Sequence, residues 1–175
     1  MNRKTNDEEA AITHYYPGTN IKMRPGDVLY SHKYALSSFL VGHTGIVGTN
    51  YRIYHVNRWK GFGHADSMPI YLSRHRKGEL ITILRHSNEQ EAIHSAKWAM
   101  QHYDKVQRYT YVRDLTRLEA NYCSKFIWQA FYFGTEGQVD LLQKRKRKSY
   151  KKFVMPGAIY RRLKKIASFE NTLYQ

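Results

Sequence analysis

The stretch that decides the fold spans residues 121–131 and holds the only cysteine of the chain: Asn121-Tyr122-Cys123-Ser124-Lys125-Phe126-Ile127-Trp128-Gln129-Ala130-Phe131. After Cys123, apolar residues recur three, four, seven and eight positions on, which is the spacing of one face of an α-helix. We therefore expect Cys123 at the N-terminal end of an amphipathic helix, where the helix dipole and free N–H groups favour a thiolate. The alternative is a small apolar side chain that fills a gap in the core.

The length of the chain indicates one folded domain. With 175 residues it can bury a hydrophobic core of its own. We expect a polar N-terminal arm over residues 1–20 and a single domain over residues 21–175. One cysteine excludes an intramolecular disulfide framework and a zinc site built from several cysteines.

The chain is strongly basic, with 29 Lys and Arg residues against 14 Asp and Glu residues and a formal net charge of +15. Such a surface attracts polyanions, among them nucleic acid, anionic lipid and acidic cell-wall polymers, and charge alone does not choose among these. The densest basic run predicts either a solvated loop or a contact with an anionic surface or substrate: Lys144, Arg145, Lys146, Arg147 and Lys148. No specific nucleic-acid partner is predicted, and the oligomeric state stays open.

The N-terminal sequence has charges without an apolar stretch behind them, so we expect no signal peptide. No run approaches the roughly 20 apolar residues that a membrane-spanning helix needs. These features favour a cytoplasmic protein.

Two short runs around a polar loop predict a β-hairpin. Residues 42–47 and 51–56 flank Gly48-Thr49-Asn50, and a loop of these three residues places His43 directly opposite His55. Directly opposite residues share a face of the sheet. A loop one residue longer would put the two histidines on opposite faces.

Other segments have simpler patterns. Residues 79–85 predict a buried strand, residues 70–72 a short strand, and residues 89–103 a helix capped by Ser87. Asp27, in a Pro-Gly-Asp turn, is expected to cap that turn. Five further histidines lack metal-ligand spacing and are expected on the surface, so no metal and no cofactor are predicted: His64, His75, His86, His94 and His102.

A cysteine nucleophile needs a base within reach, and the base needs a third polar group to orient it. The hairpin supplies two candidates, His43 as the base and His55 as the orienting residue. The backbone N–H of Cys123, in the first helical turn, is placed to help hold an oxyanion. Packing alone is the competing interpretation for both histidines.

Three motifs in order resemble the circularly permuted papain-fold branch of the NlpC superfamily, the YiiX- and YaeF-like amidases: residues 25–29 (Pro-Gly-Asp-Val-Leu), 42–47 (Gly-His-Thr-Gly-Ile-Val) and 121–130. The lecithin-retinol acyltransferase group is a more distant relative. The resemblance covers roughly residues 23–166 and implies an α+β domain with a small antiparallel sheet packed against the cysteine helix. In the unpermuted enzymes cysteine precedes histidine, whereas here His43 precedes Cys123.

The resemblance implies that Cys123 is the nucleophile, His43 the general base and His55 the third residue. Many YiiX-like proteins have glutamate at that third position, while the acyltransferase group has histidine, so His55 leaves the two chemistries open. Tyr122 is a candidate for lining the substrate pocket, with packing as the alternative.

The function expected from the sequence is therefore cysteine-dependent hydrolysis of an amide or related acyl bond in a small-molecule, peptide or lipid substrate. One alternative is a lipid-directed acyltransferase or phospholipase-like enzyme. A second alternative is a non-catalytic binder of nucleic acid or anionic surfaces.

Overall fold

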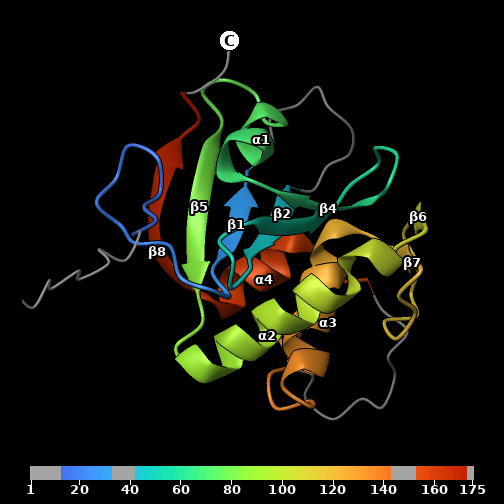
Figure 1. Ribbon diagram of the computed structural model, residues 1–175. Coiled ribbons are helices and arrows are strands. Elements are labelled where there is room, and N and C mark those ends of the chain that lie inside the picture. The colour runs from blue at the N-terminus through green and yellow to red at the C-terminus, as the bar shows by residue number, and fades with distance from the viewer. Residues whose placement is uncertain (1–12, 33–41, 143–152, 173–175) are drawn as a thin grey trace, which may run out of the picture.

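A single antiparallel sheet organises residues 13–32, 42–142 and 153–172, which are the residues described by this computed structural model (Figure 1). Within these residues the sheet has six strands in the order β4-β3-β2-β1-β5-β8. Their bounds are β1 (Val28–Ser31), β2 (His43–Val47), β3 (Ile53–Val56), β4 (Gly63–Asp66), β5 (Leu80–Arg85) and β8 (Lys164–Glu170). Every neighbouring pair in this sheet is antiparallel.

Four α-helices accompany the sheet in the described ranges: α1 (Met68–Ser73), α2 (Glu89–His102), α3 (Cys123–Gly134) and α4 (Pro156–Arg162). A single 3-10 turn, η1 (Tyr103–Lys105), follows α2. Two short parallel strands, β6 (Arg108–Tyr109) and β7 (Ala120–Asn121), lead into α3. The helix predicted from the spacing after Cys123 is confirmed, with Cys123 as its first residue.

The sheet separates two hydrophobic cores, because successive side chains of a strand point to opposite faces. On β2, Ile46 joins the first core, where it meets Phe126 and Ile127 of α3. The next residue, Val47, joins the second core with Tyr71 of α1. Helices α2, α3 and α4 therefore cover one face of the sheet, and α1 lies against the other face (Figure 1).

The mixed α+β class expected from the sequence is confirmed, with the cysteine helix packed on the sheet. The short strand predicted over residues 70–72 is wrong, because these residues belong to α1. Pro69 occupies the first turn of that helix, where its missing N–H costs no hydrogen bond. The cap of α2 is Asn88, whose side chain accepts from Gln90 N and Glu91 N, and not Ser87.

The hairpin register differs from the prediction. Gly45 pairs with His55 and Val47 with Ile53, so the loop spans residues 48–52 and is two residues longer than expected. A shift of two residues keeps every side chain on its face, whereas a shift of one reverses it. His43 and His55 therefore still share a face, as diagonal neighbours instead of directly opposite partners.

Part of the segment expected to be a polar arm packs against the sheet. Tyr16 is buried in the second core, and its hydroxyl donates to the Asp27 carboxylate at 2.7 Å. Asp27 also accepts from Arg24 N at 3.0 Å and from Arg85 Nε at 2.6 Å. The contact with Arg24 N is the expected cap of the turn before β1. It is one part of a larger buried network around Asp27. The arm boundary at residue 20 stays a prediction.

The Asp27 network predicts a stability effect. Replacing Asp27 by Asn leaves Arg85 without its charged partner, so the free energy of unfolding should fall by about 3 kcal/mol. Urea denaturation followed by circular dichroism measures the change. The matched control is Asp114→Asn, at an exposed carboxylate, which should change stability by no more than about 0.5 kcal/mol. Equal effects of the two variants would contradict this role of Asp27.

Candidate active site

Cys123 begins α3 at a point held by buried polar contacts. Lys125 Nζ donates to the carbonyls of Arg117 and Ala120 at 2.5 and 3.0 Å. One helical turn later, Gln129 accepts from Asn121 Nδ2 at 2.6 Å. These side chains of α3 hold the segment that precedes the helix. Cys123, at the junction of the two, is thereby held in position.

The Cys123 side chain lies beside the beginning of β2. Its Sγ is 3.9 Å from the carbonyl oxygen of Gly42, the residue directly before His43. The side chain is only 3 % exposed. Burial raises the pKa of the thiol, and this effect outweighs the lowering effect of the N–H and hydroxyl groups of Thr44 and Ser124. The helix N-terminus was expected to favour the thiolate, but in the resting protein desolvation has the larger effect on the pKa of the thiol.

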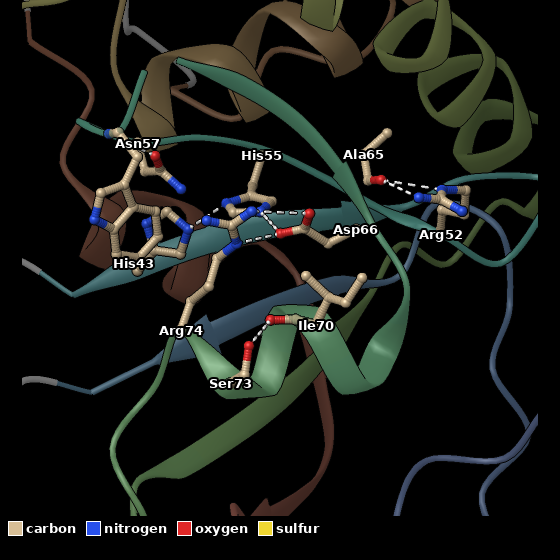
Figure 2. A network of polar contacts seen from close by, with 10 residues as sticks. His43, Arg52, His55, Asn57, Ala65, Asp66, Ile70, Ser73 and Arg74 are labelled. Carbon is tan, nitrogen blue, oxygen red and sulfur yellow. Dashed lines mark hydrogen bonds and ion pairs between the residues drawn. The ribbon is translucent and has the colours of Figure 1, made fainter. Parts of the chain in front are cut away.

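The two histidines of the hairpin are hydrogen-bonded to each other (Figure 2). His43 Nε2 lies 3.0 Å from His55 Nδ1. On the far side of His55, Nε2 lies 2.8 Å from Oδ2 of Asp66, the last residue of β4. Asp66 in turn accepts from Arg74 Nε at 2.6 Å and from Arg74 Nη2 at 3.1 Å. The result is one continuous row from His43 to Arg74, drawn from β2, β3, β4 and the end of α1.

Asp66 determines which atom donates and which accepts in each hydrogen bond of this row. Burial raises the pKa of its carboxyl, but the hydrogen bonds from His55 and Arg74 outweigh burial and hold the pKa well below its usual range. A carboxylate only accepts hydrogen bonds, so His55 must carry its proton on Nε2. His55 Nδ1 then accepts, and His43 must donate from Nε2. This leaves Nδ1 of His43 with the free lone pair of a base.

Both imidazoles are neutral near pH 7. The pKa of His43 is well below its usual value. Burial is the largest cause, and the neighbouring His55 is the second. Burial also lowers the pKa of His55 to about 4, although Asp66 acts in the opposite direction. The resting site therefore contains a neutral thiol and two neutral rings, and not a preformed ion pair.

Helix α3, which begins at Cys123, packs on one face of the sheet, whereas the His43 ring lies near Tyr71 and His75 on the α1 side. Thr44 shares the α3 face with Ile46, whereas His43 shares the α1 face with Val47. Because His43 is the first residue of β2, its ring lies at the end of the strand. Within the described residues no hydrogen bond joins Sγ to this ring. Such bonds are often long before substrate binds and tighten in the complex.

Tyr122 is buried directly before Cys123. Its hydroxyl accepts from Val154 N at 2.7 Å, and its ring lies 4.9 Å from the ring of Tyr111. Burial raises the pKa of Tyr122 to about 12. These contacts fit packing, and its substrate-lining role stays a prediction.

The sequence analysis missed Asp66 and Arg74. The unused signal was His-Ala-Asp at positions 64–66, which has the alternation of a third hairpin strand. His64 and His75, expected on the surface, have rings 5.4 Å from His55 and 5.7 Å from His43. In the part of the chain that the structure describes, no three His, Cys, Asp or Glu side chains are grouped to hold a metal ion.

Comparisons with known proteins identify the family and the fold of the chain. A family model described as "Lipoprotein N-acylation protein LnsA-like" matches residues 4–144, which is most of the chain. The chain belongs to this LnsA-like family. No curated protein sequence matches it. The family and the fold together indicate an enzyme of the cysteine hydrolase or acyltransferase kind.

The fold of this LnsA-like protein is similar to that of a crystal structure described as the metalloprotein yiiX from Escherichia coli O157:H7. The two share 14% sequence identity with a TM-score of 0.58, over 84% of this chain and 98% of the other. The expected YiiX-like, permuted papain fold is thereby confirmed. None of the helices in the described residues has the length and apolar character needed to span a membrane.

The histidine pair predicts how stability depends on pH. The pKa of His55 is lower in the folded protein than in the unfolded chain, so stability is complete above about pH 6.5 and is lost as the pH falls towards 4. For His55 alone the loss should reach about 3 kcal/mol. Urea unfolding at pH 7 and pH 4.5 measures it. His55→Gln should show a smaller loss than wild type, whereas His94→Gln, at an exposed histidine of α2, should behave as wild type. Equal pH dependence in all three proteins would contradict the assignment.

Proposed function

We propose that this LnsA-like protein moves an acyl group through a thioester on Cys123, from an ester or amide donor to an amine acceptor. The observation that carries the proposal is the row of hydrogen bonds from Asp66 through His55 to His43, which ends on a ring nitrogen with a free lone pair. Such a base, next to the strand end that Cys123 contacts, provides what a thiol nucleophile needs. Buried, neutral groups suit a reaction in which charge forms only after substrate has excluded water.

The proposed reaction has two half-reactions. In the first, His43 Nδ1 takes the thiol proton while Sγ attacks the acyl carbon, and the imidazolium then protonates the leaving group. In the second, His43 takes a proton from the acceptor amine, which attacks the thioester, and the sulfur leaves as thiolate and regains its proton. His55 and Asp66 act as positioning residues, because they keep a proton on Nε2 of His43 throughout the reaction.

Apolar side chains around the site support an acyl group with an aliphatic chain. Trp59 is 49% exposed and lies under the Arg74 guanidinium at 4.8 Å from the ring centroid. On the Cys123 side, Tyr111 is 41% exposed and contacts Tyr122. Exposed aromatic rings, one of them beside an arginine, suit a substrate with an apolar chain and an anionic head. The basic run Lys144–Lys148, the other candidate for anionic contact, lies outside the described residues.

Hydrolysis of an amide, which the sequence analysis favoured, differs from this proposal in the acceptor, with water in place of an amine. The family description, which names N-acylation, supports transfer to nitrogen. A non-catalytic binder would need neither the free Nδ1 of His43 nor a nucleophile beside it.

Formation of the acyl-enzyme is the first test. Incubation with 4-nitrophenyl octanoate should release a burst of nitrophenol and add one octanoyl group to the protein, seen by intact mass spectrometry and removed by neutral hydroxylamine. Cys123→Ala should gain no mass. His43→Gln should slow acylation by about 100-fold or more, because the general base is gone. Equal acylation of wild type and Cys123→Ala would contradict the proposal.

The acceptor is tested on the same acyl-enzyme. A peptide with a free N-terminal amine is offered beside the same peptide acetylated at its N-terminus, and both lack lysine. Transfer predicts octanoyl-peptide from the first only, measured by mass spectrometry. Free octanoic acid as the only product with both peptides would establish a hydrolase instead.

A further inference from the structure

Thr44 occupies a position where its hydroxyl has no structural use. It is the second residue of β2, is 0% exposed and points to the α3 face of the sheet. Among the residues that the structure describes, its Oγ1 has no hydrogen-bond partner. A buried hydroxyl without a partner destabilises a fold, and a valine of the same shape would avoid that cost.

The same row of the sheet contains a threonine that is used structurally. Tyr30 of β1 pairs with Thr44 on one side and with Thr82 of β5 on the other. Thr82 is also 0% exposed, but its hydroxyl is 2.9 Å from Ser168 Oγ on β8. Both threonines are buried at the same level of the sheet. Among the described residues, the Thr82 hydroxyl has a hydrogen-bond partner and the Thr44 hydroxyl has none.

What distinguishes Thr44 is the neighbouring sulfur. Cys123 Sγ lies 3.9 Å from the carbonyl oxygen of Gly42, two residues before Thr44. Burial raises the pKa of the thiol, and four groups act against it: the N–H and the hydroxyl of Thr44, and the N–H and the hydroxyl of Ser124. A neutral thiol is a weak acceptor, whereas a thiolate needs donors once water is excluded.

We propose that the Thr44 hydroxyl is a further catalytic group, which donates a hydrogen bond to the Cys123 thiolate when His43 removes the proton. Among the described residues the hydroxyl has no partner in the resting protein, and in the reacting state the charged sulfur becomes its partner. Thr44 and Ser124 thus stabilise the thiolate from β2 and α3, while His43 holds the proton. This inference deepens the proposed function, since it assumes that Cys123 reacts as a thiolate.

The groups around the sulfur leave its titration readable. Tyrosines from several elements interact with Cys123, and burial raises the pKa of each, so they stay neutral through pH 9. His43 is already neutral above pH 7. The groups in question are His43 on β2, Tyr30 on β1, Tyr71 on α1, Tyr109 on β6 and Tyr122 before α3. A change in the pH dependence of the alkylation rate between pH 7 and pH 9 therefore reports on the thiol itself.

The test is the rate of alkylation by iodoacetamide as a function of pH, in wild type, Thr44→Val, Thr44→Ser and Thr82→Val. Because Cys123 is the only cysteine, the rate reports on this thiol alone, and no acyl donor is required. Thr44→Val should raise the midpoint by about one pKa unit and so lower the rate near pH 7 about tenfold. Thr44→Ser keeps the hydroxyl and should remain close to wild type.

Thermal denaturation separates this role from packing. Thr44→Val should unfold at the same temperature as wild type or higher, because a hydroxyl without a partner is removed. Thr82→Val should unfold at a lower temperature, since Ser168 loses its partner, while its thiol midpoint stays at the wild-type value.

An unchanged midpoint in Thr44→Val would overturn the inference, as would a Thr44→Ser variant that behaves like Thr44→Val. A large loss of stability in Thr44→Val would overturn its premise that the hydroxyl has no structural use. Failure of the octanoyl transfer reaction leaves these alkylation results intact, so the two proposals fail separately.

Discussion

The hydrogen bond from His55 Nε2 to the Asp66 carboxylate is the contact on which the rest of the site depends. A carboxylate kept ionised by Arg74 and His55 can only accept, so each ring nitrogen along the row takes a defined role. The row ends at His43, whose remaining ring nitrogen carries a lone pair and is the base in the proposed reaction. Residues from four elements meet in this row, so the third hairpin strand and the end of α1 are as necessary to it as β2 and β3.

Burial decides the resting charge of the site. It raises the pKa of the Cys123 thiol and lowers the pKa of His43, so that both groups are neutral before substrate arrives. A thiolate–imidazolium pair formed in advance would have to carry its charge without water around it. In the proposed reaction, the donors near the sulfur, from Thr44 and Ser124, stabilise the charge once it appears. The site is thus organised for charge that forms during the reaction.

Much of the arrangement of Cys123, His43 and His55 could be predicted from the sequence, for physical reasons. Helical spacing placed Cys123 at the start of α3, because apolar periodicity depends on local geometry alone. The hairpin placed His43 and His55 on one face even though the loop length was wrong, since an error of two residues preserves the face. The role of Asp66 and the upward shift of the thiol pKa were missed, because both depend on packing between distant segments that no local pattern shows.

The most direct test of this account is the protonation of the two rings, read from a two-bond ¹H–¹⁵N correlation spectrum at pH 7. The spectrum is assigned with His43→Gln and His55→Gln, and Asp66→Asn serves as the comparison. The account predicts that His43 and His55 are both neutral, with the proton on Nε2 and an unprotonated Nδ1, and that Asp66→Asn loses this fixed pattern. A charged ring, or a proton on Nδ1 of His55, would contradict it.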